Sequence, residues 1–253
     1  MKKIKEQIII NVAKSGEGHI PSALSVLDIL WVLYHKILKI DPKNPKDENR
    51  DRFVLSKGHA SIGLYAILAD IGFFSVEALE TFSAYDSFLG GHPDCNKVPG
   101  IEASTGSLGH GMPVAIGMAL GLKIKSAQSR VFCLIGDGEA NEGTIWESAL
   151  LAGHHKLNNF YCIIDHNRST ERALSVDDLL KKFEAFNWET RVVNGHNHSE
   201  LEKVFTVSST DKPVAIIANT VKGCGVKLME NNQAWHHRTP NKEELDQIIK
   251  DLV

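Results

Sequence analysis

The sequence predicts an α/β fold in which a mostly parallel sheet is covered by helices on both faces. Helix-like and strand-like runs alternate along the chain, the order typical of α/β proteins. Three runs, 130–135, 160–165 and 213–220, are almost continuously apolar, as expected of parallel strands buried on both faces. With 253 residues, 43% of them hydrophobic, and with no linker-like segment, residues 1–253 are expected to form one domain.

The first elements follow from periodicity and from turn residues. Residues 1–15 contain a short apolar stretch among lysines, which predicts an amphipathic helix in preference to a signal peptide. Residues 22–39 carry apolar side chains at helical spacing after Ser22, which is the expected N-cap. A strand is expected at 52–56 and a helix at 60–72.

The second half of the chain supplies the remaining expected elements. The glycine-rich segment 105–123 predicts a loop that opens into a long helix. Helices are expected at 142–153 and 177–185, between the three apolar strands. Because parallel strands need crossover connections, these helices fit the predicted sheet.

Charge and cysteine content exclude several classes of protein. The formal net charge is −3 and no basic cluster is present, so neither a nucleic-acid-binding nor an acidic-tail protein is expected. No stretch reaches the roughly 18 consecutive apolar residues of a membrane span, and a cytoplasmic protein is expected. The cysteines form no CxxC pair, which favours free buried thiols over disulfides or a zinc site: Cys95, Cys133, Cys162 and Cys224.

The stretch "IGDGEANEG" marks a candidate ligand site. Asp137 follows the strand 130–135 directly, and ligands of open parallel sheets bind beyond the carboxyl ends of the strands. Gly136 and Gly138 would let a diphosphate approach the backbone, and the N-terminus of the following helix would attract its charge. Asn167 lies just past the next apolar strand, so its amide oxygen and Asp137 could hold a Mg²⁺ ion. Read alone, "GDG" is a tight turn; with Asn167 it indicates a metal-diphosphate site.

These residues resemble a known family. "GDGEANEG" with Asn167 resembles the motif of thiamine diphosphate enzymes, and further motifs occur in the order seen in the N-terminal half of transketolases: "GHIPSALS", "LSKGHA", "GGHPD", "TGSLGHG", "KGCGV" and "WHHRTP". The resemblance covers nearly the whole chain. It implies the three-layer thiamine diphosphate-binding fold, with the chain as its diphosphate-binding domain.

The resemblance also implies roles for individual residues. The expected metal ligands, for Mg²⁺, Ca²⁺ or Mn²⁺, are Asp137, Asn167 and the carbonyl of Ser169. The expected cofactor contacts are His59, Gly106, Ser107, Leu108, Gly136, Asp137, Gly138, Glu139, Glu142, Asn167 and His236. Within this set, Gly138 would donate its N–H to the diphosphate and Leu108 would wedge the cofactor into its bent form. Glu142 would connect the two cofactor sites of a dimer.

Histidines suit the implied chemistry, because proton transfer on sugar oxygens near neutral pH favours imidazole. The expected catalytic histidines are His19, His59, His92 and His236. Other histidines are expected to be structural or solvent-exposed: His35, His154, His155, His196 and His198. The glycine-rich "KGCGV" is expected either to close over the site or to form only a turn.

The resemblance implies transfer of a two-carbon ketol unit from a ketose, expected to be phosphorylated, to an aldose acceptor. In transketolases the glutamate that activates the pyrimidine ring belongs to a second domain, which we expect on a partner chain in an α2β2 assembly. Two alternatives remain: the α-subunit of a 2-oxo acid dehydrogenase, and a non-catalytic subunit that keeps the fold.

Several positions depart from the family pattern. Ile20 replaces a usual proline, His110 a common glutamine and His237 a common glycine, and the segment 165–175, "DHNRSTERALS", is unusual. These changes cluster around the expected site, so the substrate sugars are left unassigned.

Overall fold

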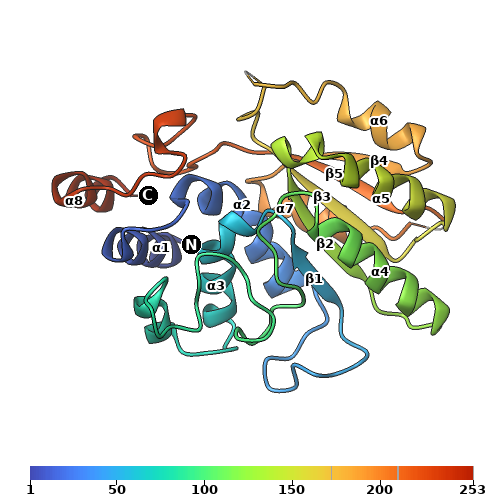
Figure 1. The fold of residues 1–253 in the computed structure, drawn as a ribbon, viewed down its shortest axis with the longest axis horizontal. Helices are drawn as coiled ribbons and strands as arrows, with labels where there is room; N and C mark the ends of the chain where they lie inside the picture. Colours follow the sequence, from blue (N-terminus) through green and yellow to red (C-terminus); the bar gives the residue numbers. More distant parts are fainter. Residues whose placement is uncertain (172, 210, 253) are drawn as a thin grey trace.

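The computed structural model describes residues 1–171, 173–209 and 211–252. Its centre is a sheet of five parallel strands in the order β1-β2-β3-β5-β4 (Figure 1). The strands are β1 (Arg52–Leu55), β2 (Val131–Gly136), β3 (Phe160–His166), β4 (Glu189–Asn194) and β5 (Val214–Asn219). The predicted parallel sheet is therefore confirmed.

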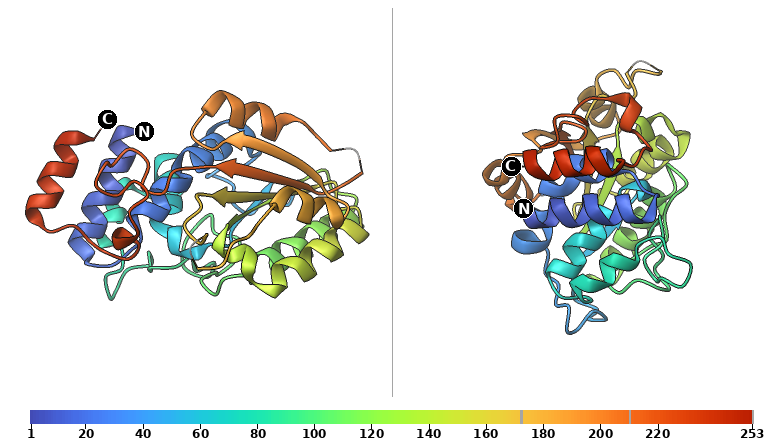
Figure 2. Two further views of the ribbon diagram at one scale, coloured as in Figure 1. Left: turned by 90° about the horizontal axis from the view of Figure 1, so that it is seen from above. Right: turned by 90° about the vertical axis from the view of Figure 1, so that its left-hand side faces the viewer.

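Helices cover both faces of the sheet, because alternate residues of the buried strands point to opposite sides. On one face, Phe132 and Leu134 pack with residues of α1 (Lys2–Ser15), α2 (Ile20–Val32), α3 (Ser61–Asp70) and α7 (His198–Thr206). On the other, Cys133 and Ile135 pack with residues of α4 (Gly111–Ile124), α5 (Gly143–His154) and α6 (Leu179–Ala185). Figure 2 shows the last helix, α8 (Lys242–Asp251), beside α1 at the end of the molecule away from the sheet.

Helix α2 begins earlier than the sequence indicated. Its N-cap is His19 and Pro21 lies in the first turn, where the fixed φ of proline suits a helix and its missing N–H costs nothing. The expected N-cap, Ser22, was wrong: it lies inside the helix, and its buried hydroxyl has no hydrogen-bond partner among the described residues. The helix ends in a π-helical turn, Leu33–Ile37, before the expected residue 39.

The run Ile20–Ile37 is long and apolar enough to cross a membrane, with a mean hydropathy of 1.3 over 18 residues. However, 78% of it is buried inside the protein. It packs against α3 and the sheet, which is the place of a core helix.

Three elements escaped the sequence analysis. Strand β4 lies at the edge of the sheet, and only Val193 among its residues is buried, so it lacks the apolar run that revealed the other strands. Helices α7 and α8 are short, although each begins with an asparagine whose side chain accepts backbone N–H groups: Asn197 and Asn241.

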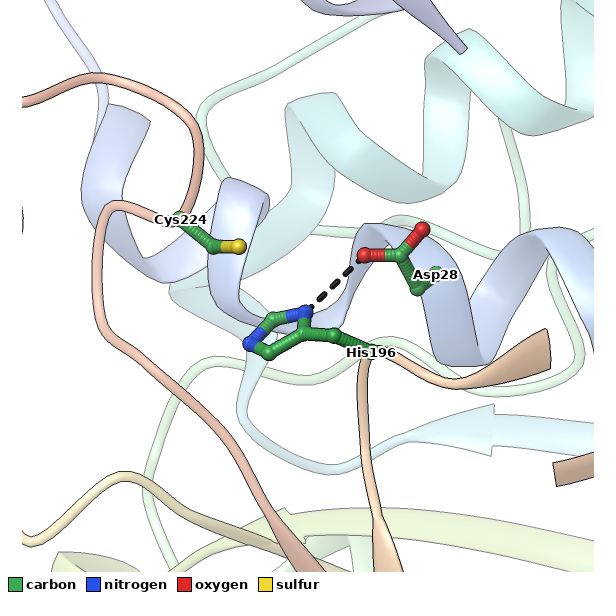
Figure 3. Close-up of side chains that lie close together, drawn as sticks. All are labelled: Asp28, His196 and Cys224. Carbon is green, nitrogen blue, oxygen red and sulfur yellow. Dashed lines mark hydrogen bonds and ion pairs between the residues drawn. The ribbon is translucent and has the colours of Figure 1, made fainter. Parts of the chain in front are cut away.

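The cysteines are free thiols, but only Cys133 and Cys162 are buried; Cys95 is exposed and Cys224 half-buried. Two histidines expected to be structural, His196 and His198, both hydrogen-bond to Asp28 on α2. Figure 3 shows Cys224 close to this group, on the loop that follows β5.

Candidate active site

A pocket of about 310 Å³ opens at the carboxyl ends of β2 and β3. It is lined by Lys57, His59, Leu108, Gly136, Asp137, Gly138, Glu139, Asn167, Ser169, Thr170, Ala173, Gln233 and His236. Residues 171 and 173 flank Arg172, the one part of the unusual segment 165–175 that lies outside the described residues. The fold thus brings together residues as far apart in the sequence as Lys57 and His236, at the edge where ligands of parallel sheets bind.

Asp137 is a buried carboxylate held by backbone groups. Its Oδ1 accepts the N–H of Gly138 at 2.7 Å and its Oδ2 accepts the N–H of Arg168 at 2.5 Å. Burial, together with the nearby Asp165 carboxylate, raises the pKa of Asp137 above its ordinary value. Among the described residues no Lys, Arg or His side chain forms an ion pair with Asp137, so the site favours an added cation.

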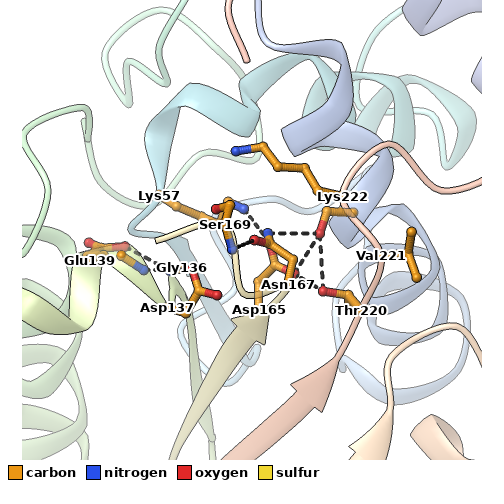
Figure 4. A network of polar contacts seen from close by, with 12 residues as sticks. Lys57, Gly136, Asp137, Glu139, Asp165, Asn167, Ser169, Thr220, Val221 and Lys222 are labelled. Atoms are coloured by element: carbon orange, nitrogen blue, oxygen red, sulfur yellow. Dashed lines mark hydrogen bonds and ion pairs between the residues drawn. The ribbon is translucent and has the colours of Figure 1, made fainter. Parts of the chain in front are cut away.

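Asn167 is oriented by a network that the sequence analysis missed (Figure 4). Its Nδ2 donates to Asp165 Oδ2 at 2.9 Å and to Ser25 Oγ at 3.2 Å, while its Oδ1 accepts the N–H of Ser169 at 3.0 Å. Asp165 forms a fully buried ion pair with Lys57. Burial alone would raise the pKa of Asp165, but the Lys57 ammonium and the hydrogen bonds from the Thr220 and Ser25 hydroxyls together lower it below its ordinary value.

The donor set around Asp137 fits a hard divalent cation. It consists of the Asp137 carboxylate, the Asn167 amide oxygen and the carbonyl of Ser169, which also accepts a hydrogen bond from Gln233 Nε2 at 2.8 Å. Oxygen ligands of these kinds suit Mg²⁺, and each of these oxygens has a lone pair left after the contacts described. The residues present are therefore compatible with a magnesium-bound diphosphate.

A short turn follows β2 before helix α5 begins. Residues Gly138–Asn141 form a short 3₁₀ turn, and α5 begins only at Gly143 with Glu142 as its N-cap. The Gly138 N–H donates to Asp137, so its expected donation to a diphosphate requires that it share or exchange this bond. Helix α5 (Gly143–His154) therefore agrees with the helix expected at 142–153, and the short turn separates its N-terminus from the end of β2.

Glu139 holds the glycine-rich loop against the sheet. Its Oε1 accepts hydrogen bonds from Ser56 Oγ at 2.5 Å and from the Gly109 N–H at 2.9 Å, and its Oε2 accepts the Gly136 N–H at 3.1 Å. Only 1% of Glu139 is exposed. Glu139 thus lines the pocket, while its oxygens connect the residue after β1, the end of β2 and the loop before α4.

Three of the expected catalytic histidines form one cluster. The ring centroids of His19 and His59 lie 5.1 Å apart, and those of His19 and His236 lie 5.3 Å apart. His19 Nδ1 donates to the carbonyl of His236 at 2.9 Å, so its Nε2 remains an acceptor. Burial, with neighbouring cationic and imidazole groups, lowers the pKa of His19 to about 4 and that of His59 to about 2, and it also lowers the pKa of His236. These rings are neutral near pH 7.

The other expected residues lie around the pocket without lining it. His92 packs its ring against Gly106, where an added Cβ would come within 3.1 Å of the His92 Cδ2 atom. Ser107 is exposed in the same loop, and Glu142 is exposed at the start of α5. Their expected roles toward the cofactor, the substrate and a second site remain predictions.

A further cation, missed by the sequence analysis, lies beside the histidines. Lys222 is 7% exposed, and its Nζ lies 2.8 Å from His236 Nδ1. Burial and the nearby Lys57 ammonium lower the pKa of Lys222 to about 8. The "KGCGV" segment therefore reaches the site through Lys222; its glycines allow the turn, since Gly223 has φ 83° and an added Cβ would lie 2.6 Å from the Met229 oxygen.

Comparisons with known proteins agree with this geometry. The family model described as "Transketolase, thiamine diphosphate binding domain" matches residues 2–252. The chain is 38% identical over 258 residues to an apulose-4-phosphate transketolase subunit of Phocaeicola vulgatus, covering 99% of this chain and 92% of that protein. It is 35% identical over 256 residues to the 6-deoxy-6-sulfo-D-fructose transketolase subunit SqwG of a Clostridium species, covering 98% and 93%.

A solved structure of a longer protein contains the same fold. The transketolase of Campylobacter jejuni superposes with a TM-score of 0.91 at 33% identity, over 98% of this chain but only 41% of that one. The chain thus spans about two fifths of that transketolase. Thiamine diphosphate is the cofactor of the matched domain, and the relatives are transferases. The chain belongs to the transketolase family and carries its thiamine diphosphate binding domain.

Proposed function

We propose that this chain is the diphosphate- and metal-binding subunit of a two-component transketolase, which transfers a two-carbon ketol unit from a ketose to an aldose acceptor. The observation that carries the proposal is the pocket at the ends of β2 and β3, where the buried Asp137 carboxylate forms no ion pair with a Lys, Arg or His side chain among the described residues. The cluster of neutral imidazoles adjoins it. The similarity to proteins named as single subunits of transketolases supports it.

In this proposal Asp137, Asn167 and the Ser169 carbonyl hold the metal, and the metal holds the diphosphate. The proposed donors to the phosphate oxygens are the Gly138 N–H, which would share its bond to Asp137, and the Lys222 ammonium, which has further protons besides the one given to His236. Leu108 packs against the aminopyrimidine end. When bound, thiamine diphosphate supplies the carbanion-stabilising chemistry that breaks and forms the C–C bond.

The proposed role of the histidines is to move and hold protons on sugar oxygens. A neutral imidazole offers one donor nitrogen and one acceptor nitrogen. The lowered pKa values of His19 and His59 keep both rings neutral, so each ring retains one donor and one acceptor. His236 presents its Nε2–H, because Lys222 donates to its Nδ1. His92 is assigned to the sugar, away from the diphosphate.

We further propose that residues 1–253 are a single diphosphate-binding domain and that a partner subunit carries the pyrimidine-binding domain with its activating glutamate. Two copies of each would form an α2β2 assembly with two sites. A candidate contact between copies is the outer side of α4 and α5, which exposes three apolar side chains and two glycines with no neighbour at the Cβ position: Val114, Leu150, Leu151, Gly117 and Gly121. Glu142 lies at the start of α5, next to this surface.

The proposed donor is a ketose with an anionic end, in the cytoplasm. The names of two relatives specify apulose 4-phosphate and 6-deoxy-6-sulfo-D-fructose, and both sugars carry a strongly acidic group at one end. No 2-oxo acid dehydrogenase is among the relatives described above, so the alternative of an α-subunit of that class has no comparable support.

The test is co-expression of the chain with a candidate C-terminal half, followed by assay of ketol transfer from a panel of ketose phosphates and sulfonates. The proposal expects turnover that depends on thiamine diphosphate and Mg²⁺ with at least one of these donors. Turnover of pyruvate or branched 2-oxo acids with a lipoyl acceptor, and none of any ketose, would instead favour the dehydrogenase alternative.

A further inference from the structure

Outside the pocket, the loops after β4 and β5 meet α2 in a polar cluster of Asp28, His196 and Cys224 (Figure 3). One ligand atom of each residue lies within 4.8 Å of the others, and these residue types bind zinc in many proteins. However, both ring nitrogens of His196 already have partners. Nδ1 lies 2.9 Å from Asp28 Oδ2, and Nε2 lies 2.8 Å from the Val221 nitrogen.

The partner of Nε2 fixes the protonation of the ring. The Val221 amide can only donate, so His196 Nε2 is an acceptor and its proton lies on Nδ1. Asp28 Oδ2 accepts the hydrogen bond from His196 Nδ1–H. The other carboxylate oxygen, Oδ1, lies 2.7 Å from His198 Nε2. Burial would lower the pKa of His196, but Asp28 and Cys224 raise it to about 9. A second proton on Nε2 would, however, point at the Val221 N–H. The contact geometry therefore favours the neutral ring. A metal on Nδ1 would require the proton to move to that same blocked position.

The Val221 amide begins the segment that delivers Lys222 to the candidate site. Gly223 N–H, on the other side of Lys222, donates to the Pro21 carbonyl at 3.0 Å. The backbone on both sides of Lys222 is therefore fixed, once by His196 and once by the first turn of α2. These two backbone contacts matter because Lys222 is buried near the like-charged Lys57. Burial and like charge both favour movement of the ammonium toward solvent, and a fixed backbone opposes that movement.

We infer that His196, oriented by Asp28, is a positioning residue for the catalytic site: it holds the Val221 amide so that the Lys222 ammonium donates to His236 Nδ1 and leaves the Nε2–H of His236 facing the substrate. The chain of contacts runs Asp28, His196, Val221, Lys222, His236. The inference rests on the proposed function for the role of His236, but the contacts upstream of His236 can be tested without it.

The first measurement uses the full chain alone. In ¹⁵N-histidine-labelled protein, His196 is expected to show a protonated Nδ1 and an unprotonated Nε2. His196→Ala removes the acceptor, and amide exchange at Val221 should then accelerate by about 10-fold, since the N–H loses its only described acceptor. His196→Gln offers an amide oxygen near the same position and should restore part of the protection.

The second measurement uses the complex with its partner subunit. His196→Ala should lower kcat by about 10-fold, the lower end of effects from residues that orient a site group, with KM for the ketose nearly unchanged. His196→Gln should recover part of kcat. The matched control is His198→Gln, which removes the other partner of Asp28 and leaves Val221 untouched, so kcat and Val221 exchange should stay within about 2-fold.

Three outcomes would overturn the inference: a proton on His196 Nε2, wild-type Val221 exchange in His196→Ala, or equal loss of kcat in His196→Ala and His198→Gln. Stoichiometric Zn²⁺ binding that disappears in Cys224→Ser would overturn it in favour of a metal site. If the wild-type complex shows no ketol transfer, the proposed function fails, while the exchange and ¹⁵N measurements still decide whether His196 holds Val221.

Discussion

Asn167 Nδ2 donates a hydrogen bond to Asp165 Oδ2 at 2.9 Å, and this contact determines which end of the Asn167 amide faces the pocket. Because the Asp165 carboxylate can only accept, the amide nitrogen points inward to it and the amide oxygen accepts the N–H of Ser169. The proposed metal ligand Asn167 is thus oriented by a carboxylate that does not line the pocket.

The first prediction concerns the ion pair on which this orientation depends. Asp165→Asn leaves the Lys57 ammonium buried without its counter-charge, and breaking such a pair costs about 3–5 kcal/mol. Urea unfolding should show this loss of free energy of unfolding. Replacing both partners, Lys57→Met with Asp165→Asn, removes both charges and keeps an acceptor for Asn167 Nδ2, so it should recover much of the loss; an equally unstable double variant would contradict the account.

The second prediction concerns the metal. Asp137→Ala removes the only carboxylate of the expected donor set and leaves the diphosphate charge poorly neutralised, so Mg²⁺-dependent affinity for thiamine diphosphate should fall by more than about 100-fold. Titration calorimetry on the complex with its partner is the measurement. Asp137→Asn, which keeps an acceptor for one backbone N–H, separates loss of charge from loss of folding; unchanged affinity in both variants would rule out Asp137 as a ligand.

His92 is predicted to act on the sugar. His92→Ala should lower kcat/KM by roughly 10²–10⁴-fold, the usual size of a general acid or base effect, while cofactor affinity stays nearly constant. The backbone of His92 also accepts the Tyr65 hydroxyl at 2.9 Å. Tyr65→Phe is therefore the control for local packing, and a weaker cofactor affinity with normal turnover in His92→Ala would place the residue at the diphosphate instead.

The fourth prediction is a dependence of stability on pH. Burial and the adjacent Lys57 lower the pKa of His59 to about 2, so between the unfolded pKa of about 6.5 and that value only the unfolded chain binds the proton. The contribution of His59 is full above about pH 6.5 and is lost as pH falls, by up to ~1.4 kcal/mol per pH unit.

Urea unfolding of wild type and His59→Gln at about pH 7 and about pH 5 measures this effect. Groups remote from His59 cancel in this difference, which therefore reports on His59 and on the neighbouring His19 and His236 rings coupled to it. Wild type should lose about 1–2 kcal/mol more than the variant on acidification; equal losses would mean that the buried ring is not kept neutral by the fold.

The sequence revealed those features that leave a local pattern. Strands β2, β3 and β5 are continuous apolar runs, and Asp137 and Asn167 follow two of them directly. Strand β4 gave no such run because it lies at the edge of the sheet, where Val192 is 54% exposed. Its six residues, ETRVVN, show no regular alternation of polar and apolar side chains that would separate them from a loop.

Contacts between segments that are distant in the sequence could not be predicted, because they leave no local pattern. Lys57 and Asp165 are 108 positions apart and Ser25 and Asp165 are 140 apart, so only the folded chain shows that they form one network. The acid at the end of "FYCIID" was a signal that could have been used, since an aspartate that ends a buried strand needs a partner. Nothing local in "KGCGV" distinguished Lys222 from a solvent-exposed lysine.

The central claim is that this chain is one half of a transketolase. The most direct measurement is a titration of the chain, at fixed concentration, with its candidate partner, reading ketol transfer in the presence of thiamine diphosphate and Mg²⁺. The account predicts no turnover from either half by itself and activity that rises to a plateau at a 1:1 ratio, with a mass by light scattering that corresponds to two copies of each. Full ketol transfer by this chain alone, after mass spectrometry has excluded a co-purifying partner, would contradict it.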